Sequence, residues 1–344
     1  MIINENIYRD KRNVKYLFYK SAKPNPNLAI VFSGMPPVGK KPAYNYIRTL
    51  NGYDINRLYI LDDFGCRASY YLCENKDYSI EESVINLIDK IKEENNIKNI
   101  ISCGSSKGGY AALYYGIKYG FNHVIAGSPQ TLLGEYLLNR TNSENIATFI
   151  SGGASNEHSN YLDRILFKII DESQHKPNVF IHVGKEEYHY HVHVKPLIKL
   201  LNDKKINNTL DLGDYSEHND VGKFFPNILK EEISKSSKTP FIKSFTKTEM
   251  NNESQISFAV ETDSLENQLA WYVFRGKLKV ATIPYSKMDK LTFEFKENGN
   301  YRVKAYVLNN YKNKVSEEIQ FKISHPEFSV ENGEELYFLE EFSN

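Results

Sequence analysis

The sequence contains little cysteine and no excess of charge of either sign. Only three of its 344 residues are cysteines, and the spacing of Cys66, Cys73 and Cys103 suits neither a disulfide framework nor a structural zinc site. We therefore expect a reducing compartment. Lysine plus arginine and aspartate plus glutamate each total 43, so the formal net charge is zero. A nucleic-acid-binding protein usually carries a basic excess, and we expect no nucleic-acid partner.

The chain also lacks a long apolar run. No stretch reaches the roughly 18 apolar residues of a membrane-spanning helix, so we expect no membrane span. The first residues, MIINENIYRDKRNVKYLF, contain neither the apolar centre nor the cleavage site of a signal peptide. These absences predict a cytoplasmic protein. At about 150 residues per domain, the length predicts roughly two domains.

The pattern that is present changes near residue 240. Before that point, β-branched runs alternate with amphipathic helical patterns. The runs are 14–19, 28–33, 57–62, 99–104, 123–128, 179–184 and 209–214, and the helical patterns are 80–95, 108–120, 161–173 and 194–203. Continuously apolar strands alternating with helices predict a mostly parallel sheet with helices on both faces. We assign residues 1–238 to this α/β domain.

The remaining residues have the pattern of an all-β domain. Strand-like runs occur at 256–261, 268–280, 290–297, 300–310 and 318–324. Short strands at close spacing predict an antiparallel sandwich over 239–344. The polar run 234–240 is the expected linker. The acidic tail after Pro326 is either a last strand or a solvated arm.

The clearest chemical signal lies between a predicted strand and a predicted helix. The segment GSSKGG at 104–109 matches G-x-S-x-G, the sharp turn that lifts a nucleophilic serine, here Ser106, above the edge of a sheet. A side chain at the flanking positions would clash with that turn, which explains Gly104, Gly108 and Gly109. The Lys107 amide and the positive end of the helix would stabilise an oxyanion formed at Ser106. The alternative is an ordinary strand–helix loop.

A nucleophilic serine needs a base, and the base needs an acid that orients it. In this architecture the acid and then the base follow the serine along the chain. His218 lies just past the last predicted strand and is the expected base, with a surface-loop histidine as the alternative. The acid should follow strand 179–184. We favour Glu187, with Glu186 as its close rival and Asp214 as a third option.

Two further loops complete the expected site. Gly34 or Met35, directly after strand 28–33, is expected to donate the second amide of the oxyanion hole. Arg67 and Tyr70 follow another strand at the edge where open α/β sheets bind ligands. Arg67 is a candidate for binding an anionic or sugar group, or else belongs to a structural Asp–Arg pair. Tyr70 and Tyr188, like their neighbours Tyr71 and Tyr190, are candidates for stacking on a sugar.

Two other segments carry weaker signals. Four of the nine histidines fall within 182–193, and His189, His191 and His193 would share one face of a strand, where they would suit a metal. In a loop or a helix that geometry fails, so we expect no metal and no cofactor. The segment between about Gln130 and Asn160 is the expected lid. Its apolar residues either cap an acyl pocket or join the core.

Taken together, five segments resemble the α/β-hydrolase superfamily, over about residues 14–234. They are CGSSKGGYAALYYG, LDDFG, GKEEYHYH, EHND and the Ser33-Gly34 loop. Within it they look most like the accessory Sec component associated with O-acetylation of glycans on serine-rich adhesins, and like capsular polysaccharide biosynthesis proteins. The resemblance implies a Ser-acid-His site at Ser106, His218 and Glu187 or Glu186, with the amides of Lys107 and of Gly34 or Met35 as donors.

The C-terminal stretch 298–323 resembles the three-tyrosine, immunoglobulin-like module of two-component regulators.

From the serine turn and its expected acid and base, we predict a serine-dependent acyl-transfer enzyme, either an esterase or a glycan O-acetyltransferase, acting on a small-molecule or glycan substrate. The alternative is a catalytically retired hydrolase scaffold that binds or assembles partners in polysaccharide or glycoprotein biosynthesis. In either case the C-terminal sandwich is a candidate surface for a protein partner.

Overall fold

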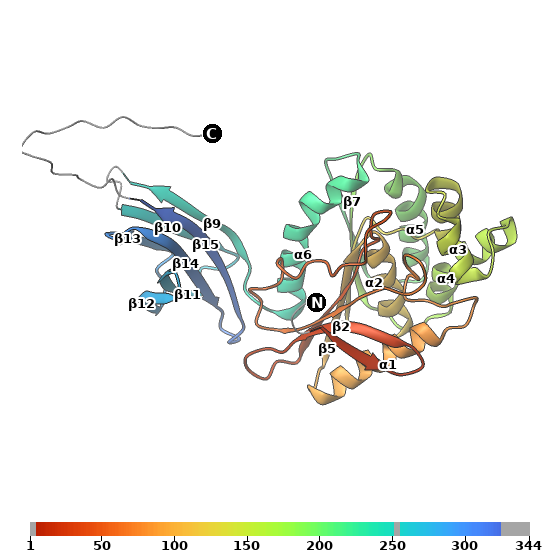
Figure 1. Ribbon diagram of the computed structural model, residues 1–344, viewed down its shortest axis with the longest axis horizontal. Coiled ribbons are helices and arrows are strands. Elements are labelled where there is room, and N and C mark those ends of the chain that lie inside the picture. The colour runs from red at the N-terminus through yellow and green to blue at the C-terminus, as the bar shows by residue number, and fades with distance from the viewer. Residues whose placement is uncertain (1–4, 251–254, 325–344) are drawn as a thin grey trace, which may run out of the picture. The chain divides into compact units, whose positions relative to one another are not determined.

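The computed structural model describes residues 5–250 and 255–324, which form two compact units (Figure 1). The first unit holds the described residues up to Phe241 together with the loop Asn309–Val315, and the second holds the others. Within the described ranges, no helix combines the length and the apolar character needed to cross a membrane.

The first unit is built on an eight-stranded sheet. The two strands at one edge, β1 and β2, run antiparallel to their neighbours, and the six others pair in parallel. In spatial order the strands are β1 (Asn6–Arg9), β2 (Asn13–Tyr19), β4 (Asn56–Ile60), β3 (Asn27–Phe32), β5 (Asn99–Ser105), β6 (His123–Gly127), β7 (Asn178–Gly184) and β8 (Asn208–Gly213). The predicted mostly parallel sheet is therefore confirmed, and β1 is an added edge strand.

Helices cover both faces of this sheet (Figure 1). They are α1 (Ser79–Glu94), α2 (Lys107–Lys118), α3 (Glu144–Ser151), α4 (Asn156–Glu172), α5 (Lys195–Asp203) and α6 (Val221–Ser237). Side chains of α1, α2, α4 and α5 share one core with Leu28, Ile30 and Phe32 of β3. The helix α6 packs on β5, β6 and β7 from the other side. Three short helical turns complete the unit: η1 (Glu135–Arg140), η2 (Tyr190–Val194) and η3 (His218–Asp220).

The apolar spacing of α1 shows why the sequence forms these helices. Val84, Leu87, Ile88 and Ile91 recur at three- and four-residue intervals, and all of them are buried. The predicted linker at 234–240 is wrong in part, because Ser234 and Ser237 are buried in the last turn of α6. Serine is compatible with a helix end where its hydroxyl bonds the backbone, and the Ser237 Oγ donates to the Ile233 carbonyl at 2.6 Å.

The second unit consists of two antiparallel sheets. One has the order β13 (Lys290–Glu294), β10 (Gln255–Thr262), β9 (Ile242–Glu249), and the other β12 (Leu278–Ser286), β11 (Gln268–Arg275), β14 (Gly299–Leu308), β15 (Lys314–Ile323). The predicted sandwich is confirmed. The single predicted run 268–280 is instead two strands, because Gly276 adopts a left-handed φ of 56° and turns the chain. The tail after Pro326 lies outside the described residues.

Aromatic side chains fill the centre of the second unit. Trp271 is fully buried, and Phe295 packs edge-on against Tyr301 with ring centroids 4.8 Å apart. Such contacts add to the free energy that burial of the rings already contributes.

The topology of the first unit places several chain segments together. The parallel strands β3, β5, β6, β7 and β8 all end at the same edge of the sheet. The loops that follow carry Ser33 to Met35, Ser106, Ser128 to Gln130, Glu187 and His218. Residues that are nearly 200 positions apart in the sequence therefore converge at one edge, which is where open α/β sheets bind their ligands.

Candidate active site

Ser106 occupies a strained turn between β5 and α2. Its backbone has φ 55° and ψ −119°, a conformation that an L-residue adopts only when the surrounding structure requires it. The glycines around it allow the chain to pack this closely. A Cβ added to Gly104 would lie 2.6 Å from the Gly108 carbonyl carbon, and one added to Gly108 would lie 2.3 Å from the Phe32 carbonyl oxygen. Both positions therefore exclude any other residue.

A line of hydrogen bonds runs from Ser106 to a buried carboxylate. The Ser106 Oγ lies 3.0 Å from Nε2 of His218, and Nδ1 of the same ring lies 2.6 Å from Oε1 of Glu187. In this arrangement the carboxylate fixes the proton on Nδ1, so that Nε2 is free to accept the serine proton. The three side chains come from three different loops at the carboxyl edge of the sheet.

Glu187 is held as a buried anion. Its side chain is 1% exposed, and its second oxygen accepts hydrogen bonds from Ser128 Oγ at 2.8 Å and from the Gly184 amide at 3.3 Å. Burial alone would raise the pKa of Glu187. The adjacent imidazoles of His189 and His218 outweigh burial and hold this pKa well below its usual range. The carboxylate therefore stays ionised over the whole physiological range.

The other two candidate acids lie away from the base. Glu186 is exposed, and its amide donates to the Tyr215 carbonyl. The Asp214 side chain is 91% exposed and pairs with Lys185 at 2.7 Å. Of the three acids, the structure places Glu187 on His218.

A second histidine, His189, lies against this line. Its ring stacks on His218 with centroids 4.0 Å apart and planes 11° from parallel, and its Nδ1 lies 3.1 Å from Glu187 Oε1. Burial lowers the pKa of His189 and favours its neutral form. The ligand atoms of Glu187, His189 and His218 lie within 4.8 Å of one another, as a metal site requires. The in-plane lone pairs of two stacked rings run nearly parallel and do not converge on one ion, and His218 Nδ1 is already bonded to Glu187. This geometry suits proton transfer better than metal coordination.

The predicted oxyanion hole is only partly available. The Lys107 amide opens α2, where backbone N–H groups have no acceptor within the helix and the helix dipole is positive. The Gly34 amide already donates to Oδ1 of Asn45 at 2.8 Å. Of the two predicted second donors, Gly34 would have to give up this bond to Asn45 before it could bind an oxyanion, which leaves Met35 as the remaining candidate.

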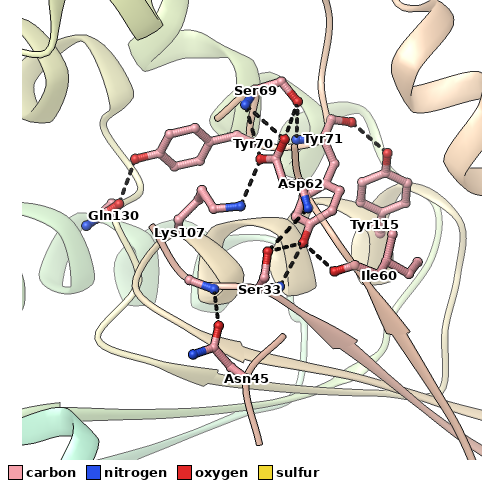
Figure 2. Close-up of polar contacts among 11 residues, drawn as sticks. Ser33, Asn45, Ile60, Asp62, Ser69, Tyr70, Tyr71, Lys107, Tyr115 and Gln130 are labelled. Atoms are coloured by element: carbon pink, nitrogen blue, oxygen red, sulfur yellow. Dashed lines mark hydrogen bonds and ion pairs between the residues drawn. The ribbon is translucent and has the colours of Figure 1, made fainter. Parts of the chain in front are cut away.

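The Lys107 side chain has a role that the sequence did not indicate. It is fully buried, and its Nζ bonds Oδ2 of Asp62 at 2.8 Å and lies 4.4 Å from the centroid of the Tyr71 ring (Figure 2). Burial lowers the pKa of Lys107, and the Asp62 carboxylate counteracts this effect. The Asp–Arg pair, which was the alternative to ligand binding by Arg67, is wrong. Asp62 pairs with Lys107 and Asp63 pairs with Lys15. Arg67 instead donates to the Pro36 carbonyl at 2.9 Å.

The predicted substrate-stacking role of Tyr70 is contradicted. Tyr70 and its neighbour Tyr71 are both 0% exposed, so neither ring is open to a sugar. The Tyr70 hydroxyl instead donates to Oε1 of Gln130 at 2.7 Å, and the Tyr71 hydroxyl donates to the Ile60 carbonyl at 2.8 Å (Figure 2). The aromatic density of this segment therefore reflects packing beneath the serine turn.

Tyr188 is half-buried and lines a cavity of about 510 Å³ that reaches His218. The Arg140 guanidinium lies 4.6 Å from the centroid of its ring, and its hydroxyl donates to Glu135. The other lining residues are Tyr136, Thr141, Glu186, Glu187, His189, Ser216 and Glu217. Tyr136 and Arg140 belong to η1, so the expected lid contributes to this wall. Its residues Leu133 and Leu137 join the core instead.

The sequence interpretation missed two direct partners of the site. Gln130 donates its side-chain amide to Ser106 Oγ at 2.6 Å, and Ser128 donates to Glu187. Both follow β6, whose carboxyl end lies beside that of β5. Adjacency to the serine strand is the signal that could have found them, because neither residue belongs to a spaced motif.

No protein-family model matches the sequence. A segment of 107 residues is 31% identical to the proline iminopeptidase of Saccharolobus solfataricus. This match covers 31% of the chain and 34% of that protein, so the chain matches about a third of the length of this relative.

Solved structures are similar to a larger share of the chain, about two thirds of it. The capsule O-acetyltransferase of Neisseria meningitidis serogroup A superposes with a TM-score of 0.58 at 24% identity, covering 68% of this chain and 96% of that one. A mutant of the same enzyme has been solved in complex with CoA and superposes with a TM-score of 0.57 at 23% identity, over 67% and 96% of the two chains.

The glycosylation-associated Gap123 complex of Streptococcus agalactiae gives a TM-score of 0.58 at 18% identity, over 68% of this chain and 47% of that one. The fluorophosphonate-binding serine hydrolase F of Staphylococcus aureus gives 0.50 at 15% identity, over 68% and 97%. The first unit has the α/β-hydrolase fold. At identities below a quarter, these likenesses establish the fold of the first unit and not its activity.

Proposed function

We propose that the first unit is a serine-dependent acyl-transfer enzyme that uses Ser106, His218 and Glu187. The observation that carries the proposal is the unbroken line from Ser106 Oγ through both ring nitrogens of His218 to Glu187, at 3.0 and 2.6 Å. A strained nucleophile, a base within reach of it and a buried ionised acid together form the arrangement that nucleophilic acyl transfer requires.

The first half-reaction forms an acyl-enzyme. Ser106 Oγ attacks the carbonyl carbon of an ester or thioester, and its proton passes to His218 Nε2. The carbonyl π electrons move onto oxygen, where the amides of Lys107 and Met35 would stabilise the oxyanion. Glu187 stabilises the imidazolium. Collapse of the intermediate expels the leaving group, which takes the proton from His218.

The second half-reaction reverses these steps with a new nucleophile. His218 removes a proton from water or from an acceptor hydroxyl, whose oxygen attacks the acyl carbon. The bond between that carbon and Ser106 Oγ then breaks, and His218 returns the proton to Oγ. We propose a glycan hydroxyl as the acceptor and an acetyl thioester as the donor. Two features support this choice: the cavity beside His218 is walled by Tyr136, Tyr188 and Arg140, which suit a hydroxylated ligand, and the capsule O-acetyltransferase with the same fold has been solved with CoA.

A product assay tests the proposal. Purified protein is incubated with p-nitrophenyl acetate or acetyl-CoA, with and without a panel of sugars, and free acetate and acetylated sugar are quantified by mass spectrometry. We expect acetyl release that Ser106→Ala abolishes, and diversion of acetyl groups from water to an accepted sugar. Ser105→Ala is the matched control, because Ser105 adjoins the nucleophile but bonds Tyr46 at 2.5 Å.

Two results would contradict parts of the proposal. Folded wild-type protein with no Ser106-dependent turnover would favour the non-catalytic scaffold. Turnover that releases only acetate with every sugar would favour an esterase over a transferase.

A further inference from the structure

Ser106 Oγ has a second polar partner besides the base. Nε2 of Gln130 donates to it at 2.6 Å, which is shorter than the 3.0 Å separation from His218 Nε2. The Gln130 side chain is 0% exposed, whereas Ser106 is only partly buried, so a buried amide donates to a hydroxyl that substrate can still reach. A hydrogen bond whose donor is shielded from water is electrostatically stronger than one in bulk solvent.

We propose that Gln130 is a further catalytic residue, whose side-chain N–H stabilises negative charge on Ser106 Oγ, and that Tyr70 is the positioning residue that fixes the Gln130 amide. This inference rests on the proposed function, since it concerns the same serine. It goes further by giving the nucleophile a donor that lies outside both the Ser-acid-His line and the oxyanion hole.

The orientation of the Gln130 amide decides where the serine proton points. The Tyr70 hydroxyl donates to Gln130 Oε1 at 2.7 Å, which leaves Nε2 facing Ser106 (Figure 2). In the opposite orientation, Oε1 would face Ser106 and accept a hydrogen bond from its hydroxyl, in competition with His218. Tyr70 therefore directs the serine hydroxyl to the base.

Tyr70 is itself held by a buried polar scaffold (Figure 2). It adopts a left-handed φ of 56°, an unfavourable backbone conformation for an aromatic residue. Asp62 stabilises this turn by accepting from the Ser69 amide at 3.0 Å and from the Ser69 hydroxyl at 2.9 Å. Lys107 neutralises Asp62. A closed chain of contacts therefore runs from Lys107, the residue after the nucleophile, through Asp62 and Ser69 to Tyr70. From Tyr70 it continues through Gln130 to Ser106.

The chemical role follows from the charge on Oγ during the reaction. In the attack, the Oγ–H bond breaks, the proton moves to His218 Nε2, and the Oγ–C bond forms while the carbonyl electrons move to oxygen. In the release, the Oγ–C bond breaks, its electron pair returns to Oγ, and His218 returns the proton. Gln130 transfers no proton. The hydrogen bond from Gln130 N–H to Oγ is strongest while Oγ is most negative, which is early in attack and late in release. This hydrogen bond therefore stabilises both transition states more than the ground states.

The experiment compares variants at both ends of this chain of contacts. Gln130→Met keeps the length of the side chain and removes the donor, and Tyr70→Phe removes the hydroxyl that orients it. Tyr110→Phe is the matched control, because Tyr110 packs on Tyr70 with centroids 5.4 Å apart while its hydroxyl has no hydrogen-bond partner among the described residues. The readouts are the rate of Ser106 labelling by a fluorophosphonate probe, kcat and KM for p-nitrophenyl acetate, and the melting temperature.

We expect Gln130→Met to lower both the labelling rate and kcat by about 10- to 100-fold, with KM changed by less than about threefold, because the lost bond forms mainly in the transition states. Tyr70→Phe should lower them by about 3- to 10-fold. The double variant should match Gln130→Met within about twofold, because Tyr70 acts only through Gln130. Tyr110→Phe should keep wild-type rates.

Three outcomes would overturn the inference. A Gln130→Met protein with wild-type rates means that the donor has no catalytic effect. If the fold losses in labelling rate and kcat of the two single variants multiply in the double variant, the two residues act independently, as separate packing elements would. Wild-type protein without labelling overturns the proposed function as well, whereas normal wild-type labelling with an unaffected variant overturns this inference alone. Tyr70→Phe removes a single atom and keeps the test decisive if Gln130→Met does not fold.

Discussion

Replacing Glu187 with glutamine should place the proton on the wrong nitrogen of His218. The reason lies in the fixed donors around the carboxylate. The Gly184 amide and the Ser128 hydroxyl both donate to Oε2 of Glu187. In Glu187→Gln, the amide carbonyl must occupy that position, because an NH₂ group there would face the backbone N–H of Gly184. The NH₂ group then faces His218 Nδ1 and donates to it.

A donor at Nδ1 leaves the neutral ring protonated on Nε2, where it cannot accept the serine proton. The substitution also removes the negative charge that stabilises the imidazolium. For an acid in this role, the combined loss is about 10³- to 10⁴-fold in rate, or about 4 to 5.5 kcal/mol in activation free energy. The labelling rate of Ser106 and kcat for p-nitrophenyl acetate should therefore fall by this factor.

The control for this variant is Asp214→Asn. Asp214 is also an acid near the base in sequence, but it is solvent-exposed and bonds Lys185. Its replacement should change the rate by less than about twofold, as expected for an exposed ion pair. A Glu187→Gln protein that retains more than about a tenth of the wild-type rate would refute this role for Glu187, since the wrong tautomer cannot support that turnover.

Three further predictions concern stability. Lys107→Met leaves Asp62 buried without its cation and should lower the free energy of unfolding by about 3 to 5 kcal/mol, measured by urea titration of the helical circular dichroism signal. Burial is the main cause that lowers the pKa of His193 to about 3 in the folded protein. Above the unfolded pKa of about 6.5, the ring is neutral in both states, and the stability that depends on the buried neutral ring is fully present. As the pH falls from about 6.5 toward 3, only the unfolded chain gains a proton on His193, so stability is lost, on the order of 5 kcal/mol in total. His193→Asn, which keeps an acceptor for the Leu132 amide, should show a shallower loss across that interval in thermal melts at stepped pH, and an unchanged slope would contradict this account. Gly108→Ala places a Cβ 2.3 Å from the Phe32 carbonyl oxygen and should give insoluble or inactive protein, so a soluble variant with wild-type turnover would show that the packing argument is wrong.

The sequence predicted most of the strands and the serine turn because each has a local signal, whereas β1 and β9 were not predicted. The apolar runs of β3 and β5 are long enough to identify a buried strand, and the glycines around Ser106 restrict the backbone in a recognisable pattern. His218 and Glu187 could be proposed from their positions after particular strands. Their contact with each other is a property of the assembled sheet edge, and the structure supplies it.

The remaining features depend on contacts that no local pattern encodes. Tyr70 and Tyr71 have the composition of a binding loop, and only the packing of α2 over them shows that they are buried. Gln130 lies in a short loop without a spaced motif, so its bond to Ser106 is visible only in three dimensions. For Lys107 the sequence predicted only a backbone amide that donates to the oxyanion. Its side chain pairs with Asp62 in the interior, because the turn directs that side chain inward.

The most direct test of the central claim is peptide mass spectrometry after treatment with a fluorophosphonate probe. The comparison is between wild type, Ser106→Ala, His218→Ala and Ser105→Ala. We expect a single adduct on Ser106 that is absent from Ser106→Ala, forms much more slowly in His218→Ala and is unchanged in Ser105→Ala. Wild-type protein with intact secondary structure that forms no adduct, or labelling of Ser106 that persists at the wild-type rate without His218, would contradict it.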